Sequence, residues 1–242
     1  MKLCKERLYI TMLLIQLLYL INIMLSIDSY RKLHIRICRA DCLIVNNDVI
    51  ILGLLIIPLI AISMLEELSF FDKKQLIVKY QTYGRIAGEK MKVLLKFAAI
   101  FTVYQFCSSY IWSLLMSNQM ISWDKPDGAV NCFYNSVCRM GFASVAMLYL
   151  ITLFFTIFIN LLIVLIFNEL NIKWLGIGSI VILALVGYNM KNTELLISPI
   201  ALQYRHLVRP DRIYLICAGY VAVTVFLMLI NYLIIKNKEY TK

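Results

Sequence analysis

Six long apolar runs alternate with short polar, charged segments along the 242 residues of this chain. An α-helix rises ~1.5 Å per residue, so ~20 apolar residues cross a ~30 Å hydrocarbon core. The pattern predicts an all-α integral membrane protein with six transmembrane helices in one domain, residues 1–242. The expected spans are Leu8–Ile27, Val49–Leu65, Phe97–Ser117, Gly141–Phe167, Trp174–Met190 and Ile213–Ile235.

The polar residues inside these runs are neutral amides and hydroxyls, such as Gln16, Gln105 and Asn160. An ionisable side chain that persists in a span usually has a function. The predicted spans offer no group that exchanges a proton near neutral pH. If the protein moves a solute, the energy must therefore enter from elsewhere.

Composition agrees with a membrane protein, because 62% of the residues are hydrophobic and only 16% are charged, with a mean hydropathy of +0.80. The net charge of +10 falls in segments that flank the apolar runs. Basic residues there are attracted to anionic lipid headgroups. No segment is free to form a soluble basic face, so nucleic acid is not an expected partner.

Lysine and arginine counts predict the orientation, because cytoplasmic loops carry an excess of them. With both termini on one side, that side holds 14 Lys and Arg and the other holds 10. The excess comes from the segment between the second and third spans. We expect a multi-pass protein of the cell membrane with both termini in the cytoplasm.

Four of the seven cysteines lie in the two segments that this topology places outside: Cys38, Cys42, Cys132 and Cys138. Disulfides persist in oxidising compartments, so these four are candidates for one or two bridges. Four cysteines allow three connectivities, and the sequence does not choose among them. Four free thiols near the membrane are an equal alternative.

The segment Glu66–Lys92 mixes both charge signs with aromatic residues. Its apolar positions Leu76, Ile77, Tyr80 and Tyr83 fall near one helical face. A short amphipathic helix on the inner surface fits this pattern, and Gly84 marks a turn or an end. Such a helix either anchors the segment or docks a cytoplasmic partner.

Three other segments predict local features. Pro58 is expected to kink the second span, because proline removes a backbone donor. Small residues of the fifth span, Gly176 and Gly178 among them, permit close helix packing. The apolar stretch Leu195–Tyr204 is too short to span and contains Pro199, which suggests short outer helices before the sixth span.

The chain shows no set of residues typical of an enzyme site. His34 and His206 have no metal-ligand spacing with cysteines or carboxylates. The pair Glu66-Glu67 lacks the arginine and the intramembrane histidines of a glutamate protease. No G-x-x-x-x-G-K-[ST] loop is present, so the chain has no P-loop nucleotide site. We expect no catalytic residue, cofactor or metal in this chain.

The inner segment resembles the permease subunits of ABC transporters of the type-2 export class. There, an acidic residue at the end of the second span begins a coupling helix, and Glu66 or Glu67 matches it. Tyr83-Gly84-Arg85 stands in place of the family's Pro-x-Ser-Arg turn, and Gly88-Glu89-Lys90 in place of Gly-Lys. The specific likeness covers about Glu66–Lys96, and the Pro-Ser of the turn is missing.

The resemblance implies a permease that works with a second permease, identical or homologous, and with separate ATPase subunits that bind ATP and magnesium. It implies a peptide, drug or lipid substrate, with a bacteriocin or lantibiotic export or immunity system as one setting. The residues that would contact the ATPase are Glu66, Glu67, Leu76, Ile77, Tyr80, Tyr83, Arg85 and Lys90.

Two other function classes stay open. One is a non-transporting membrane immunity or assembly subunit that binds a toxin or another membrane complex. The other is a membrane enzyme, which would need clustered polar catalytic residues in the spans. Co-purification of an ATPase separates the transporter from both.

Overall fold

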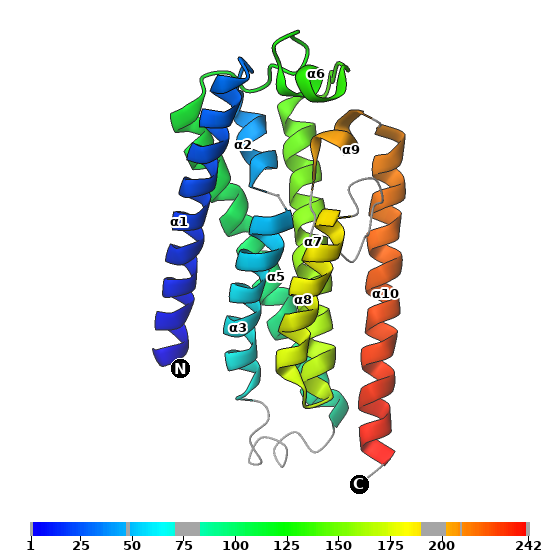
Figure 1. Cartoon of the computed structure of the whole chain (residues 1–242). Coiled ribbons are helices and arrows are strands. Elements are labelled where there is room, and N and C mark those ends of the chain that lie inside the picture. The colour runs from blue at the N-terminus through cyan, green and yellow to red at the C-terminus, as the bar shows by residue number, and fades with distance from the viewer. Residues whose placement is uncertain (1, 47–48, 71–82, 190–201, 209, 241–242) are drawn as a thin grey trace.

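The computed structural model is a bundle of helices that stand side by side along one axis (Figure 1). It describes residues 2–46, 49–70, 83–189, 202–208 and 210–240. Within these ranges the backbone forms helices and turns, with one isolated bridge between Arg36 and Gly128 and no strand. The all-α architecture predicted from the apolar runs is therefore confirmed.

The long helices carry most of the chain. They are α1 (Lys2–Lys32), the π-helix η1 (Ile50–Ile56) continued by α3 (Ile57–Leu68), α5 (Tyr83–Met116), α7 (Phe142–Glu169), α8 (Lys173–Asn189) and α10 (Pro210–Tyr240). Within the described ranges the short helices are α2 (Arg39–Val45), α6 (Ala129–Tyr134) and α9 (Tyr204–Val208).

Five helices in the described ranges are long and apolar enough to cross a membrane. They contain the expected first, second, third, fourth and sixth spans. The expected fifth span coincides with α8, which is apolar but has 17 residues. At ~1.5 Å per residue α8 is ~25 Å long. A multi-pass membrane protein is thus supported, whereas a sixth crossing stays a prediction.

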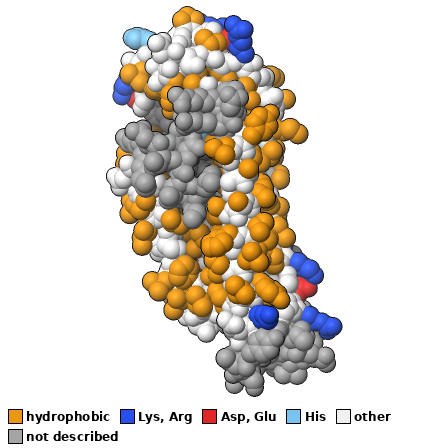
Figure 2. All heavy atoms as spheres, turned by 90° about the vertical axis from the view of Figure 1, so that its right-hand side faces the viewer, with side chains coloured by type: hydrophobic (Ala, Val, Ile, Leu, Met, Phe, Trp, Pro, Cys, Tyr) orange, Lys and Arg blue, Asp and Glu red, His pale blue; other side chains and the backbone are white. Residues whose placement is uncertain are grey.

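The outside of the bundle is apolar along its length. Figure 2 shows hydrophobic side chains over the side of the molecule, with lysines and arginines near its two ends. Leu115 and Leu215 are each 71% exposed. Soluble proteins rarely expose contiguous apolar surface of this extent, so this surface suits contact with lipid.

The core is centred on α7. In its most apolar stretch 67% of the residues are buried, compared with 22% in α1 and in α10. Leu153, Ile157, Leu161 and Val164 of α7 are fully buried and belong to the main hydrophobic cluster. Helix α7 contacts α5, α8, α10 and α3. Helix α7 is therefore the helix around which the others pack.

The second span changes helix type at its proline. Pro58 begins the first turn of α3, directly after the π-helical residues Ile50–Ile56. The Ile57 amide donates to the Leu52 carbonyl, five residues back. A proline ring clashes with the carbonyl four residues before it, and the wider π-turn gives that carbonyl room. The change of helix type lies at Pro58, and the kink expected there stays a prediction.

Close packing of α8 on α7 depends on one glycine. A Cβ added at Gly176 would lie 3.0 Å from Phe167 Cβ and 3.1 Å from Val164 Cα. At Gly178 an added Cβ would meet nothing within 4 Å. The expected role of small residues in this helix is confirmed for Gly176 and does not apply to Gly178.

The two ends of the bundle differ in construction. The start of α1, the end of α3, the start of α5, the turn from α7 to α8 and the end of α10 lie at one end, which we call the termini end (Figure 1). The short helices α2, α6 and α9 lie at the other, which we call the cap end. This arrangement agrees with the predicted placement of both termini on one side, and the identity of that side stays a prediction.

Helix α5 is longer than the predicted third span. It begins at Tyr83, 14 residues before Phe97. Charged residues end the apolar run there without ending the helix, since Lys, Arg and Glu are good helix formers. Gly84 therefore lies in the first turn of α5. Residues 71–82, which hold most of the predicted coupling helix, lie outside the described residues, so that helix stays a prediction.

The outer segments are more ordered than the sequence suggests. The polar stretch 33–48 contains α2, in which Ala40, Asp41, Cys42, Leu43 and Ile44 are buried. Helix α9 lies just before the last span and shares only Tyr204 with the stretch Leu195–Tyr204 in which short helices were expected. Residues 190–201, which hold most of Leu195–Tyr204, are outside the described ranges.

Candidate functional site at the termini end

Four charged side chains join three helices at the termini end. Glu67 ends α3 and its Oε1 lies 3.3 Å from Lys96 Nζ of α5. Lys90 Nζ of α5 lies 2.8 Å from Glu169 Oε1 at the end of α7. We call these residues the junction. One ion pair of the junction connects α5 to α3, and the other connects α5 to α7.

The two pairs differ in burial. Lys90 and Glu169 are 5% and 8% exposed, whereas the Lys96 side chain is 56% exposed and that of Glu67 31%. An exposed pair contributes ~0–1 kcal/mol. A buried pair is different, because removal of one partner leaves an uncompensated charge and costs ~3–5 kcal/mol. The Lys90–Glu169 pair therefore fixes α5 to α7 firmly.

The first turns of α5 also carry charged side chains outside the junction. Arg85 is exposed and forms no ion pair with any described residue. Lys92 pairs with Glu89 at 2.7 Å on the helix surface. These groups stay accessible to a partner that approaches the termini end, and Arg85 is the cation that a carboxylate of that partner can pair with.

The residues predicted to contact an ATPase have different positions. Leu76, Ile77 and Tyr80 lie outside the described residues. Tyr83 is the first residue of α5, and Arg85 lies within its first turn. The predicted contact of Leu76, Ile77 and Tyr80 with an ATPase therefore stays a prediction.

The other three predicted contacts lie at the junction or next to it. Glu66 and Glu67 are in the last turn of α3 and are partly exposed. Lys90 is buried against Glu169, which sequence reasoning did not anticipate. Lys90 therefore serves an internal contact in this structure, and Glu67 and Arg85 are the charged groups that a partner can reach.

No family model, curated protein or solved structure matches this chain. The resemblance of Glu66–Lys96 to export permeases thus stays an expectation. The chemistry of the described residues is the remaining guide to function.

A second polar centre, at the cap end, was not predicted. Asp41 of α2 is 1% exposed. Its Oδ1 accepts hydrogen bonds from Trp123 Nε1 at 2.7 Å and from the Tyr204 hydroxyl at 2.8 Å. Its Oδ2 accepts one from the Cys38 amide at 2.8 Å. One carboxylate thus joins α2, the loop before α6, and α9.

Burial dominates the electrostatics of this centre. It raises the pKa of Asp41 above its usual value, although the hydrogen bonds from Cys38, Trp123 and Tyr204 act in the opposite direction. Burial also raises the pKa of the Cys38 and Cys42 thiols to about 12, with the nearby Asp41 adding to the shift. Both thiols are therefore neutral and poor nucleophiles.

The four cysteines proposed for disulfides are free thiols in the structure. Cys38, Cys42 and Cys138 are buried and Cys132 is exposed. The segments that carry them are nevertheless joined, because Arg36 pairs with Asp127 at 2.9 Å and its amide donates to the Asp127 carbonyl. Hydrogen bonds and packing hold the outer segments together here, and covalent cross-linking stays a prediction.

The Asp41 centre has the properties of a structural element. The described residues contain no group of three or more His, Cys, Asp and Glu side chains able to hold a metal ion. Each carboxylate oxygen already accepts hydrogen bonds from the protein. The available sequence signal was a single acidic residue inside the apolar run from Ala40 to Val45, which is unusual unless the carboxylate is paired.

Neutral polar groups connect the spans themselves. Gln16 of α1 contacts Ser108 and accepts a hydrogen bond from Trp112 Nε1 at 3.0 Å, both of α5. Tyr104 donates to the Met12 carbonyl at 2.7 Å. Interhelical hydrogen bonds of this kind stabilise membrane helices. These polar contacts with α5 add to the packing of α1 on α3, where Thr11 and Ser63 share a hydrogen bond at 2.9 Å.

The side-chain amide of Gln105 makes no such hydrogen bond among the described residues. Gln105 is fully buried in α5, and neither atom of its amide has a hydrogen-bond partner among the described residues. Unpaired buried polar groups cost ~1–3 kcal/mol and need a specific explanation. Gln105 thus holds a buried amide in α5 whose hydrogen-bonding capacity the described residues do not use.

Proposed function

We propose that this protein is the transmembrane permease subunit of an ATP-driven exporter, moved by a separate ATPase subunit that holds ATP and magnesium. The observation that carries the proposal is the construction of α5. It is one continuous helix from Tyr83 to Met116, fixed near its start to the central helix α7 by the buried Lys90–Glu169 pair.

This construction gives a mechanical route from the termini end to the core. Displacement of the segment before α5 moves the helix as a unit, because a continuous helix transmits motion along its axis. The Lys90–Glu169 pair then transfers the motion to α7, which contacts α3, α8 and α10. A partner drives such a change only if it binds two states of the permease with different affinity.

The energy source fits the same proposal. The ionisable residues of the junction are engaged in pairs, and the polar groups of the apolar spans are amides and hydroxyls. Ion-coupled carriers rely on intramembrane ionisable residues. External nucleotide hydrolysis meets this need, with the termini end in the cytoplasm as the Lys and Arg counts predict. A peptide, drug or lipid is the proposed cargo, and a second permease chain completes the assembly.

The test is co-purification of the tagged chain from its native membrane, followed by measurement of ATP hydrolysis in the purified assembly. We expect an ATPase to remain attached. Arg85→Glu should reduce the attached ATPase and its stimulated hydrolysis by about fivefold or more, since a charge reversal at a contact costs at least ~1 kcal/mol. Lys32→Glu, which reverses an exposed cation at the cap end, should leave both unchanged.

Two results would contradict the proposal. Full biological activity of the chain in cells that lack every candidate ATPase would exclude a driven exporter. It would favour the non-transporting immunity or assembly subunit. Equal effects of Arg85→Glu and Lys32→Glu would exclude the termini end as the docking site.

A further inference from the structure

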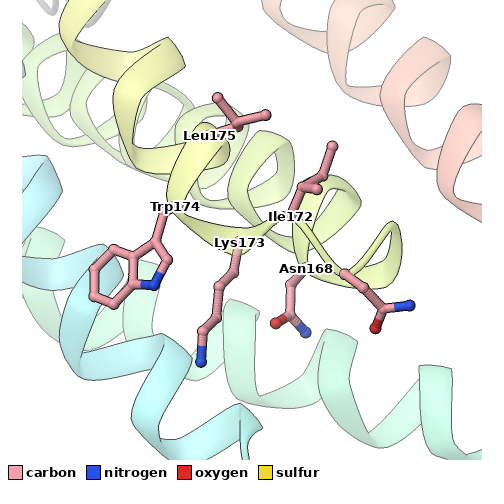
Figure 3. A pocket seen from close by; sticks show the side chains of 6 residues that line it. Asn168, Ile172, Lys173, Trp174 and Leu175 are labelled. Carbon is pink, nitrogen blue, oxygen red and sulfur yellow. The ribbon is translucent and has the colours of Figure 1, made fainter.

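A pocket of about 510 Å³ opens at the turn between α7 and α8. It is lined by Asn168, Asn171, Ile172, Lys173, Trp174 and Leu175 (Figure 3). Its volume lies in the range of small-molecule sites, ~300–1,000 Å³. The turn is at the termini end, next to Glu169 of the junction, so the pocket sits where the bundle leaves its apolar zone.

The pocket carries one positive charge that forms no ion pair with a carboxylate of the described residues. Lys173 forms no ion pair with any residue that the structure describes, and its Nζ lies 5.9 Å from the centroid of the Trp174 ring. The nearest acidic residue in the chain, Glu169, is already paired with Lys90 at 2.8 Å. The local charge is therefore +1, which favours an anion.

The rest of the lining supplies donors in a fixed turn. Asn168 and Asn171 each carry a side-chain amide that donates hydrogen bonds. Asn171 has a left-handed backbone (φ 63°), and the Ile172 amide donates to the Phe167 carbonyl at 3.0 Å. Figure 3 shows the side chains of Lys173 and Asn168 on the same side of the turn, with Leu175 directed to the other.

The apolar part of the lining points to the source of the anion. Trp174 is 65% exposed and Leu175 61%. A tryptophan beside a lysine at the end of a membrane helix is typical of the water–lipid boundary. A free anion needs only the polar half of this pocket, whereas a lipid also uses the exposed apolar half for its acyl chains.

We propose that this pocket binds the negatively charged phosphate of a phospholipid headgroup, with Lys173 as the cation and the two asparagines as hydrogen-bond donors. Trp174, beside Lys173, contacts the glycerol and the first acyl carbons. Lipid binding at this site does not require transport, so its test is independent of the test of the proposed function. A soluble phosphate compound shares the headgroup chemistry, and the experiment distinguishes the two sources.

The test is native mass spectrometry of the delipidated full chain, titrated with phosphatidylglycerol or with phosphatidylcholine. We expect preferential binding of phosphatidylglycerol. Lys173→Gln should weaken it about fivefold, the ratio given by ~1 kcal/mol per basic side chain near an anionic surface. Lys173→Arg keeps the charge and should retain the preference. Lys236→Gln removes an exposed cation of α10 near the same end and serves as the matched control.

Each outcome decides the proposal. Loss of preference in Lys173→Gln, with Lys173→Arg and Lys236→Gln unchanged, supports the site. If millimolar inorganic phosphate displaces the lipid completely, the anion site is supported and its source is a soluble phosphate compound. Equal loss in Lys173→Gln and Lys236→Gln overturns the proposal, because lipid binding would then reflect the overall positive charge of this end. No loss in either variant also overturns it, because Lys173 would then not bind the headgroup.

Discussion

The buried ion pair of the junction gives the sharpest prediction, because α5 contains a matched exposed pair two residues away. Lys90 and Glu169 are separated by 2.8 Å, and Lys92 and Glu89 by 2.7 Å. The side chains of the first pair are 6% and 10% exposed, and those of the second 72% and 35%. The first pair joins α5 to α7 and is buried, whereas the second lies within α5 and is exposed to solvent.

Lys90→Met should lower the free energy of unfolding by ~3–5 kcal/mol, because it leaves the Glu169 carboxylate buried without its cation. Lys92→Met should lower it by at most ~1 kcal/mol, since water solvates the remaining carboxylate. The double variant with Lys90→Met and Glu169→Leu should recover most of the loss, because no charge is then buried.

Equilibrium unfolding in mixed micelles, monitored by tryptophan fluorescence, measures all three variants on one scale. A second measurement, thermal aggregation in a mild detergent, should give the same order. Equal losses for the two single lysine variants would refute the reasoning, as would a double variant less stable than Lys90→Met. Either result would mean that burial does not set the strength of this pair.

Three further predictions concern packing, charge and topology. Gly176→Ala should destabilise the protein by ~1–2 kcal/mol through overpacking against α7, whereas Gly178→Ala should be neutral or slightly stabilising; thermal unfolding of both measures it. The raised pKa of Asp41 means that its protonated form is favoured in the folded state. Stability from this group is therefore present below about pH 4 and is lost as pH rises through the folded pKa; Asp41→Asn should remove this pH dependence in unfolding curves. In intact cells an impermeant maleimide should label Cys132 and leave Cys38 unlabelled; no labelling of Cys132 until the membrane is opened would reverse the predicted orientation.

The sequence predicted the helices that depend on hydrophobicity alone. Apolar runs located every long helix, since a membrane span needs only sufficient length and apolar character. The start of α5 was misplaced by 14 residues because its charged first turns are helical without being apolar. Composition also does not show whether α8 crosses the membrane, because its 17 residues are apolar but shorter than the other spans.

The contacts of the candidate site depend on distant residues. The partner of Lys90 is Glu169, 79 residues further along the chain, and local patterning carries no information about such a pair. The Asp41 centre brings Trp123 and Tyr204 together from separate segments. The mixed charges at the start of α5 predicted a contact with a partner there, but the sequence could not show that Lys90 is buried.

The central position of α7 has a consequence for biosynthesis. The chain is made from its N-terminus, so α1, α3 and α5 leave the ribosome before α7, which packs on α3 and α5 and begins at Phe142. Until then the first half has only its own contacts, which include the hydrogen bonds of Gln16 and Tyr104 between α1 and α5. Loss of those side chains should therefore harm the yield of newly inserted protein more than the stability of the finished one.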